Sequence, residues 1–485
     1  MLNPRKKSVL IHLLMLCLML FACDQERDKE ERVDADLTIL YTNDEHGWIE
    51  ESEHADGAAK LMGVWKAAEG YVEDDGFLVL SGGDNWTGPA ISTWFKGEST
   101  IEVMNAMGYD AAAIGNHEFD FTVDGLKART QQATFPYLSA NIRLKGTDII
   151  PDFIEPYIIL NVNGIQVGIV GLTTTSTYHS AFPAFVADFD FINYATALEE
   201  VVPKIWEEGA ELILCIAHIC YNEMLDLAPT AESLGISMIG GGHCNELVSE
   251  IFHDDLALIV GGWQMANYAR LDIAFSMEDL SVVDMQAQTS SNKNGSADPA
   301  IESIVSYWQQ ETEAALGEVI GYVSAEIPRY SPEMYNLVTD SWLAIYTGAD
   351  IAVTNAGGIR QALVNGDITK GDIVGVLPFD NNILELKLTG TEIIDCIGSN
   401  LILGGMTTTN GYRHTDGTPL EADSVYSVLT TDYLYIQDGT NFHLYDTNPY
   451  YTGLNYHQPT VDYILSLNTS SSNPLNNYLD YDSRR

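Results

Sequence analysis

Residues 37–46 have the sequence LTILYTNDEH, in which a short apolar run gives way at once to a polar cluster. Similar apolar runs recur along the first three hundred residues, at 37–41, 77–81, 166–172, 211–217 and 256–262. Continuous apolar runs of this length are typical of parallel strands that are buried on both faces. Between them, stretches such as 58–69 and 195–208 have apolar residues at helical spacing. This alternation predicts an α/β fold.

Polar clusters follow the predicted strands. They are TNDEH (42–46), SGGDN (81–85), GNHEFD (115–120), AH (217–218) and GGHCN (241–245). Because the carboxyl ends of strands in such a sheet share one edge, we expect these clusters to converge. Carboxylates, imidazoles and amide oxygens together form a ligand set for transition metals. One cluster alone is more often a turn or a helix start, but the whole series predicts a metal centre.

The order of the clusters resembles that of the calcineurin-like metallophosphoesterases and, among them, the 5′-nucleotidase family, which includes bacterial UDP-sugar hydrolases. The resemblance extends over nearly the whole chain beyond its N-terminus. It implies a metallophosphoesterase α/β/β/α sandwich followed by a smaller α/β substrate-binding domain. It also implies two divalent metal ions, such as Zn²⁺ or Mn²⁺, that activate water for attack on a phosphoester.

The resemblance also assigns roles to individual side chains. The two metals would be held by Asp44, His46, Asp84 and Asn245 for the first, and by Asp84, Asn116, His218 and His243 for the second. His117 would stabilise the transferring phosphoryl group or protonate the leaving oxygen, and Asp120 would orient His117. Asp84 would therefore bridge the two metals.

The cluster at 241–245 departs from the family pattern. Many members have Gly-His-x-His there or end in Gln, whereas this chain has Cys244 followed by the shorter amide Asn245. A weaker first metal site is therefore expected. Cys244 is either a thiolate that binds a soft metal or, as the favoured interpretation, a thiol buried in the core. Cys215 and Cys220 are most simply buried thiols, and the sequence leaves open whether they are paired.

The second half of the chain has its own family motifs. They are NAGGIR (355–360), LPF (377–379), LTG (388–390) and DGTNF (438–442). The resemblance implies that Asn355, Gly358 and Arg360 contact the substrate and that Phe442 stacks on its base. The position opposite that ring has Met406, which would replace a second aromatic. Losing one ring of a base clamp would weaken or redirect specificity.

The N-terminus predicts export. Residues 1–23 combine a basic start, an apolar run too short to span a bilayer, and Cys23 after a small residue. These features indicate a bacterial lipoprotein lipidated at Cys23, although an ordinary signal peptide or an uncleaved anchor is an alternative. The expected units after it are a charged tether (24–36), the metallophosphoesterase domain (37–299), a linker helix (300–316), the C-terminal domain (317–465) and a poorly ordered tail (466–485).

The charge limits the classes of partner. Lys+Arg 23 against Asp+Glu 69 gives a formal net charge of −46, which repels nucleic-acid backbones. A small anionic substrate remains compatible, because bound cations reverse the local sign. We therefore predict a periplasmic or cell-surface phosphohydrolase that releases phosphate from nucleotides and touches the membrane only through its lipid. The sequence leaves the oligomeric state open.

Other functions share the same motifs. Alternative enzymes are a 2′,3′-cyclic nucleotide phosphodiesterase/3′-nucleotidase, a UDP-sugar pyrophosphohydrolase, or a related phosphoester or thiosulfate-ester hydrolase. An alternative of another class is a lipoprotein that binds nucleotides without turnover. The presence of both His117 and Asp120 favours an enzyme, because a pure binder would not need them.

Overall fold

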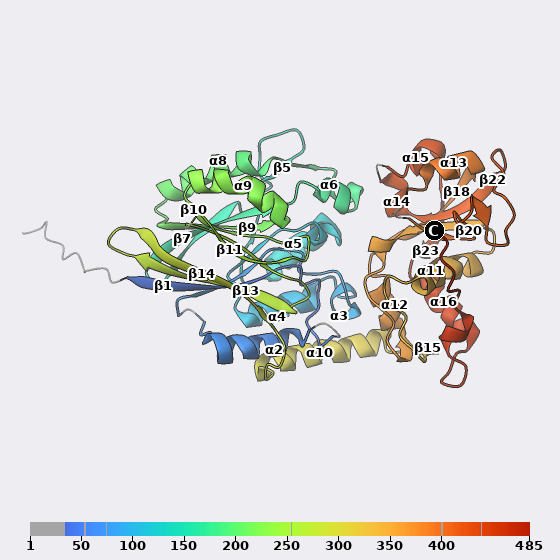
Figure 1. Ribbon diagram of the computed structural model, residues 1–485, viewed down its shortest axis with the longest axis horizontal. Helices are drawn as coiled ribbons and strands as arrows, with labels where there is room; N and C mark the ends of the chain where they lie inside the picture. The colour runs from blue at the N-terminus through green and yellow to red at the C-terminus, as the bar shows by residue number, and fades with distance from the viewer. Residues whose placement is uncertain (1–33, 53–54, 74, 254, 399–400, 438) are drawn as a thin grey trace, which may run out of the picture.

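The computed structural model describes residues 34–52, 55–73, 75–253, 255–398, 401–437 and 439–485. These residues form two lobes, one from residues up to 291 and one from residue 319 onward (Figure 1). The long helix α10 (Pro299–Leu316) lies along the first lobe and leads into the second. The predicted signal, the lipidation of Cys23 and most of the tether lie outside the described residues. Within the described part of the chain, no helix is long and apolar enough to cross a membrane.

The first lobe contains two six-stranded sheets. The first sheet has the spatial order β14 (Ser281–Ser291), β13 (Asn267–Ser276), β1 (Ala35–Thr42), β2 (Phe77–Ser81), β3 (Ala111–Ala113) and β4 (Tyr137–Leu138). The second has the order β11 (Leu247–Phe252), β12 (Leu256–Gly261), β10 (Ile236–Gly240), β9 (Leu212–His218), β7 (Ile165–Thr173) and β6 (Tyr157–Val162). The run β1 to β4 is parallel, and so is β12–β10–β9–β7. Each sheet therefore gathers the carboxyl ends of its parallel strands at one edge.

Apolar side chains hold these sheets in four layers. Alternate residues of both sheets, such as Ile39 and Leu214, interlock in a core between the sheets. The outer face of the first sheet packs against α2 (Gly57–Val64), α4 (Glu98–Met107), α5 (Thr122–Gln132) and α10. The outer face of the second packs against α8 (Tyr194–Glu207) and α9 (Tyr221–Ser233). The predicted α/β/β/α sandwich is confirmed.

The second lobe is a smaller α/β unit. Its five-stranded sheet has the order β19 (Leu401–Gly404), β16 (Ile351–Asn355), β22 (Val425–Thr431), β18 (Asn382–Thr389) and β23 (Tyr450–Asn455). One core contains side chains of α11 (Pro332–Ile345), α12 (Lys370–Val376) and α16 (Gln458–Leu467). Another core contains side chains of α13 (Gly390–Cys396), α14 (Asp432–Ile436) and α15 (Phe442–Tyr445). The lobe also has two two-stranded sheets, one of β15 (Val319–Val323) and β17 (Gly366–Thr369) and one of β20 (Met406–Thr407) and β21 (Arg413–His414).

The end of the chain differs from the prediction. Residues 466–485 were expected to be poorly ordered, but Leu475 packs in the core of the second lobe. Arg484 is buried and forms ion pairs of 2.7 Å with Asp340 and 2.8 Å with Asp480. The segment is mostly polar, so its composition did not predict that Leu475 would pack in a core and that Arg484 would form buried ion pairs. At the other end, β1 begins at Ala35, two residues inside the predicted tether.

Candidate metal and substrate site

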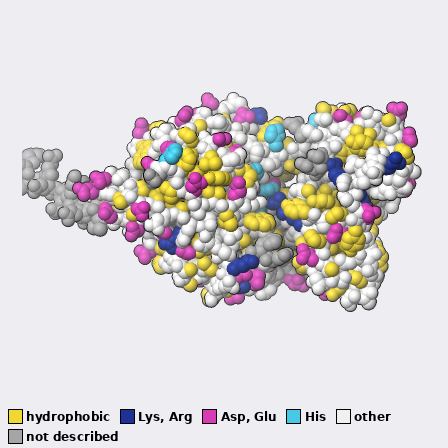
Figure 2. Space-filling view, in the orientation of Figure 1, with side chains coloured by type: hydrophobic (Ala, Val, Ile, Leu, Met, Phe, Trp, Pro, Cys, Tyr) yellow, Lys and Arg dark blue, Asp and Glu magenta, His cyan; other side chains and the backbone are white. Residues whose placement is uncertain are grey.

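A cavity of about 560 Å³ lies where the two lobes meet, and both lobes line it. In the space-filling view, basic and imidazole side chains reach the surface near this junction, whereas acidic side chains are spread over both lobes (Figure 2). The predicted site residues that line the cavity are His46, Asp84, Asn116, His117, Asp120, His243, Asn245, Asn355, Gly358 and Arg360. Two more, Asp44 and His218, are buried beside it.

The strand ends bring these side chains together, as the sequence predicts. Several adopt the left-handed backbone conformation, which non-glycine residues rarely occupy. The φ values are 52° at Asp44, 46° at His46, 57° at Asp84, 72° at His243 and 56° at Asn245. Such backbone strain costs of order 1–3 kcal/mol per residue and clusters at functional sites. The local backbone is therefore bent to aim these side chains off the sheet edge.

Asp84 occupies the centre of the cluster. One group of potential metal-binding atoms comes from His46, Asp84 and His117, and another from Asp84, His218 and His243. The atoms within each group lie within 4.8 Å of one another. Asp84 Oδ2 lies 3.0 Å from His218 Nε2 and 4.0 Å from His117 Nε2. A carboxylate shared by two groups is the arrangement that two neighbouring cations need.

The donor set fits divalent cations. Asp44 Oδ1 and Asn116 Oδ1 are buried, and neither accepts a hydrogen bond from any residue that the structure describes. Buried oxygens without a donor are costly unless something else binds them. His218 donates Nδ1–H to the Gly82 carbonyl at 2.8 Å, which turns Nε2 toward Asp84. Metal-binding histidines are commonly oriented in this way.

The electrostatics of the cluster favour neutral imidazoles at two positions. Burial and the nearby Arg360 guanidinium hold the pKa of His46 well below its usual range. Burial and the neighbouring His218 lower the pKa of His243 to about 4. By contrast, His218 is buried but pairs with Asp84, and the net effect raises its pKa to about 10. Burial, despite the neighbouring His218, raises the pKa of Asp44 to about 7. Crowded carboxylates and imidazoles of this kind are typical of functional sites.

Glu118 braces the loops that present Asp84 and Asn116. Its buried carboxylate accepts hydrogen bonds from the backbone N–H groups of Asp84 (2.9 Å), Asn85 (2.8 Å) and Gly115 (2.6 Å). Asp84 Oδ1 in turn accepts a hydrogen bond of 2.8 Å from the backbone N–H of His117. The two loops are thus tied to each other beneath the site.

His117 and Asp120 form the predicted pair. His117 Nδ1 lies 2.7 Å from Asp120 Oδ2 across the single turn that follows Asn116. This bond leaves His117 Nε2 facing the cavity. Burial opposes the charged form, but Asp120 and Asp84 outweigh it, so the pKa of His117 is raised. A proton donor is therefore held beside the proposed metal ligands.

The second lobe supplies the opposite wall. Arg360 Nη2 lies 3.3 Å from His46 Nε2, so the guanidinium of the NAGGIR motif reaches the cluster. Arg329, which the sequence interpretation missed, lines an adjoining cavity of about 200 Å³ together with Arg360, Asn245 and the buried Gln264. Arg329 lies outside the motifs identified in the sequence, so its proximity to Arg360 and Asn245 is seen only in the folded chain.

The two residues considered for a base clamp do not line the main cavity. Phe442 is 1% exposed and Met406 is buried, and both pack in an apolar core of the second lobe. Phe442 begins α15 directly after Asn441, whose left-handed backbone (φ 59°) starts that short helix. The aromatic side chains that line the main cavity are Phe182, Phe185, Phe379 and Tyr433.

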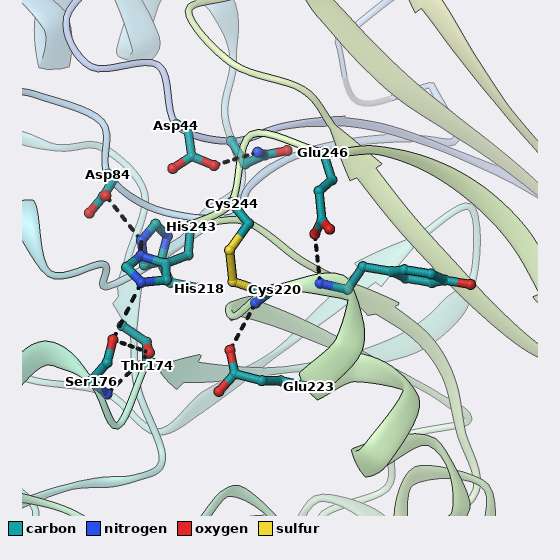
Figure 3. Close-up of a disulfide and its surroundings, with 12 residues drawn as sticks. Asp44, Asp84, Thr174, Ser176, His218, Cys220, Glu223, His243, Cys244 and Glu246 are labelled. Carbon is teal, nitrogen blue, oxygen red and sulfur yellow. Dashed lines mark hydrogen bonds and ion pairs between the residues drawn. A yellow bond between two sulfur atoms is a disulfide. The ribbon is translucent and has the colours of Figure 1, made fainter. Parts of the chain in front are cut away.

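The interpretation of two cysteines also needs correction. Cys220 and Cys244 form a disulfide, so neither is a buried thiol or a thiolate ligand (Figure 3). They lie where β9 and β10 run into their loops, with Cys244 exposed to solvent. Cys215, within β9 itself, is a buried thiol as predicted.

Comparisons with known proteins agree with this architecture. A family model described as 5′-nucleotidase, C-terminal domain, matches residues 319–447. The trifunctional nucleotide phosphoesterase protein YfkN of Bacillus subtilis (strain 168) is 30% identical over 421 residues, which cover 76% of this chain and 28% of YfkN. Protein UshA of Yersinia enterocolitica is 28% identical over 413 residues, which cover 74% of this chain and 75% of UshA. Residues 319–447 thus belong to the family of 5′-nucleotidase C-terminal domains.

A solved structure extends the likeness to the fold. The crystal structure of a 5′-nucleotidase precursor from Thermus thermophilus matches with a TM-score of 0.76 at 21% identity, covering 93% of this chain and 99% of that one. At this identity the match shows the fold, and it agrees with the two-lobed α/β architecture predicted from the sequence. The chain spans only 28% of the length of YfkN but three quarters of UshA, so its own activity is a separate question.

Proposed function

We propose that this protein is an exported, metal-dependent phosphohydrolase that releases phosphate from nucleotides. The observation that carries the proposal is the position of Asp84, shared by two groups of potential metal ligands and surrounded by buried oxygens without donors. A pocket that only bound nucleotides would not need His117 paired with Asp120 beside that cluster.

The proposed ligand sets follow the predicted ones. Asp44, His46, Asp84 and Asn245 would hold one divalent cation, and Asp84, Asn116, His218 and His243 the other. Such cations activate a water for attack and neutralise charge on the phosphoryl oxygens. Asn245 is exposed, in contrast to the buried Asp44 and Asp84, which supports a weaker hold on the first cation.

The chain's own residues complete the chemistry. Asp120 keeps Nδ1 of His117 occupied, so that Nε2 can give a hydrogen bond to the phosphoryl group or a proton to the leaving oxygen. Arg360 and Arg329 offer guanidinium groups to the phosphate from the other lobe. Asn355 and Gly358 border the same cavity and would contact the rest of the substrate.

An aromatic surface is available for the nucleoside. Tyr433 comes from the second lobe, and Phe182 and Phe185, with ring centroids 4.7 Å apart, come from the first. Phe379 packs against the His117 ring with centroids 5.8 Å apart. These rings border the cavity, whereas Phe442 does not, so they are the better candidates for contact with a base.

Hydrolysis of a small substrate panel tests the activity, with free phosphate, nucleotide monophosphates and sugar phosphate separated and measured as products by chromatography. The full chain is supplied with Mn²⁺ or Zn²⁺ and with AMP, 2′,3′-cyclic AMP or UDP-glucose. We expect metal-dependent release from AMP and a fall of about 10²–10⁴-fold in His117→Ala. Faster turnover of the cyclic nucleotide or of UDP-glucose would favour the corresponding alternative enzyme. Nucleotide binding without hydrolysis of any of the three would favour the non-catalytic lipoprotein.

A single substitution tests the weak-ligand proposal. Asn245→His restores the imidazole that many family members have at this position, and we expect tighter binding of the first metal. The dissociation constant for Mn²⁺ is measured by equilibrium dialysis. An unchanged affinity and rate would show that Asn245 does not limit metal binding.

We further propose that the protein is anchored outside the cytoplasm through a lipid on Cys23. The sequence of residues 1–23 supports this, and a disulfide near the surface suits an oxidising compartment. Labelling of cells with a radioactive fatty acid tests it. We expect label in the wild type and its loss in Cys23→Ser, and label in both proteins would contradict the anchor.

A further inference from the structure

The Cys220–Cys244 disulfide lies beside the proposed metal site (Figure 3). It joins two loops whose cysteines are 24 residues apart, with Cα atoms separated by 5.2 Å. Cys220 comes two residues after His218, and Cys244 lies between His243 and Asn245. Figure 3 shows the sulfur bridge beside the two histidines. The bridge therefore links the loops that carry three of the proposed ligands.

The loop with His243 needs such a link more than the other ligand loops do. His243 and Asn245 both have positive φ, and residues 244 and 245 are exposed to solvent. The backbone N–H of Gly242 donates to Ile219 at 2.9 Å, and that of Cys244 donates to Gly242 at 2.9 Å. The strained and exposed loop around His243 and Asn245 is therefore weakly stabilised by these main-chain hydrogen bonds.

The contacts of the His243 ring are also long. His243 Nδ1 lies 3.2 Å from His218 Nε2, and His243 Nε2 lies 3.3 Å from the Ser176 hydroxyl. By comparison, the loops of Asp84 and Asn116 share the three backbone hydrogen bonds to Glu118, of 2.6 to 2.9 Å. The covalent bond takes the place of that network at the other end of the site.

Polar contacts flank the bridge on the Cys220 side. The backbone N–H of Cys220 donates to Glu223 at 3.1 Å, and that of Tyr221 donates to Glu246 at 2.8 Å. Cys220 is thereby fixed at the start of α9, and the segment after Asn245 is tied to the same turn (Figure 3). A rigid helix start thus serves as the anchor for the loop.

We propose that the Cys220–Cys244 disulfide is a positioning element that holds His243 and Asn245 against His218 for metal binding. This inference rests on the proposed metal-dependent function. Breaking the bridge releases the strained loop, so that its ligands must be ordered again each time a cation binds. Losing a group that orients metal ligands typically weakens metal affinity 10- to 100-fold.

The experiment begins with the bond itself. A non-reduced digest of the full protein, purified from an oxidising compartment, should contain the Cys220 and Cys244 peptides as one linked species by mass spectrometry. Both peptides found only with free thiols would overturn the proposal.

The decisive measurement is metal affinity without substrate. Equilibrium dialysis against Mn²⁺ compares the wild type with the double variant Cys220→Ala, Cys244→Ala and with the matched control Cys396→Ala, which removes a buried thiol of the second lobe. Because the loop supplies Asn245 to one proposed site and His243 to the other, we expect both bound equivalents to weaken by about 10- to 100-fold in the double variant and to stay unchanged in the control. A lower melting temperature with unchanged Mn²⁺ affinity would show a merely structural bond and overturn the proposal.

Reduction of the native protein covers the case in which the double variant fails to fold. Dithiothreitol supplies two electrons and two protons, converts the S–S bond to two thiols and becomes a cyclic disulfide, and it is removed by desalting before dialysis. Circular dichroism confirms that the reduced protein is folded, and the same loss of Mn²⁺ affinity is expected. Equal affinity before and after reduction would overturn the positioning role alone, whereas a wild type that binds no Mn²⁺ would overturn the proposed function with it.

Discussion

The two walls of the cavity are built in different ways. The wall from the first lobe consists of buried and half-buried side chains, with the exposed Asn245, that follow strand ends and are held by Glu118, by ion pairs and by a disulfide. The wall from the second lobe consists of partly exposed groups, such as Arg360 and Tyr433, that stand on loops and helix starts. The comparison teaches that the reacting geometry is fixed within one lobe, whereas the hold on the substrate depends on how the other lobe meets it.

Asp84→Asn is expected to have the largest effect on activity. The substitution removes the charge shared by both proposed metal groups. Metals supply several kcal/mol of transition-state stabilisation, and each 1.4 kcal/mol is tenfold, so kcat/KM should fall by about 10³-fold or more. Bound metal, measured by atomic emission, should fall as well. The exposed Asp124→Asn serves as the control, and full metal content with full activity in Asp84→Asn would break the distinction between the walls.

Arg360→Ala tests the opposite wall. Hydrogen bonds to charged groups contribute about 1.5–3 kcal/mol, so we expect KM to rise roughly 10- to 100-fold. Metal content should not change, because Arg360 contacts His46 from the other lobe and is not itself a ligand. The exposed Arg413→Ala provides a matched loss of charge. A loss of metal rather than of substrate affinity would mean that Arg360 belongs to the metal wall.

Glu118→Gln tests the bracing of the first wall. The variant places a carboxamide N–H₂ where a carboxylate oxygen accepts backbone N–H groups, so at least one buried donor loses its acceptor. Such a loss costs about 1–3 kcal/mol, which urea denaturation should detect. We also expect a lower kcat, since the loops of Asp84 and Asn116 lose their common anchor. Unchanged stability in Glu118→Gln would show that these hydrogen bonds are dispensable.

The residues of the first-lobe wall could be predicted from the sequence, because each of them lies close to a recognisable strand along the chain. Asp44, Asp84 and Asn116 each follow an apolar strand within a few residues, and strand ends converge in a parallel sheet whatever the details of packing. The alternation of strands and helices predicted the α/β class, whereas the α/β/β/α layers were implied by the family resemblance. The backbone strain at His46 and His243 could not be predicted, because it results from the tertiary structure.

The second wall could not be predicted to the same depth. Arg329 and Tyr433 are brought to the cavity by the contact between lobes, which leaves no local pattern in the sequence. The burial of Phe442 in a core could not be predicted, because a ring after a turn has the same local sequence whether it faces a ligand or a core. The pairing of Cys220 with Cys244 likewise depends on two loops that meet only in the folded chain.

Tyr433→Leu and Phe442→Leu separate a ring that borders the cavity from one that does not. Stacking of a base on an aromatic side chain contributes about 1–3 kcal/mol. We expect Tyr433→Leu to raise KM for AMP about tenfold and to leave KM for ribose 5-phosphate, which lacks the base, unchanged. Phe442→Leu should lower the melting temperature without a change in either KM. A higher KM for AMP in Phe442→Leu, with no change in Tyr433→Leu, would show that Phe442 and not Tyr433 contacts the base.

Asp480→Asn is expected to have the smallest effect, and it tests whether the second lobe depends on the last residues of the chain. Asp480 pairs with the buried Arg484 at 2.8 Å. Partial burial opposes ionisation, but hydrogen bonds from Asp482 and Arg484 lower the pKa of Asp480. Because the pKa of Asp480 is lower in the folded protein than in the unfolded chain, where it is about 4, the ionised carboxylate stabilises the folded state at pH values above about 4. This stabilisation is lost as the pH falls through the folded-state pKa. Because the carboxylate is 39% exposed, its contribution at pH 7 should be only about 0.2–1 kcal/mol.

Urea denaturation at pH 7 and at pH 3 measures this contribution. The wild type should be more stable than Asp480→Asn at pH 7, and the difference should narrow as Asp480 becomes protonated. The exposed Asp482→Asn, which leaves the ion pair in place, should show no such pH-dependent difference. If the lobes unfold in separate steps, only the transition of the second lobe should shift, because Arg484 and Asp340 both belong to it. A shift confined to the first lobe would instead show that the end of the chain supports the metal wall.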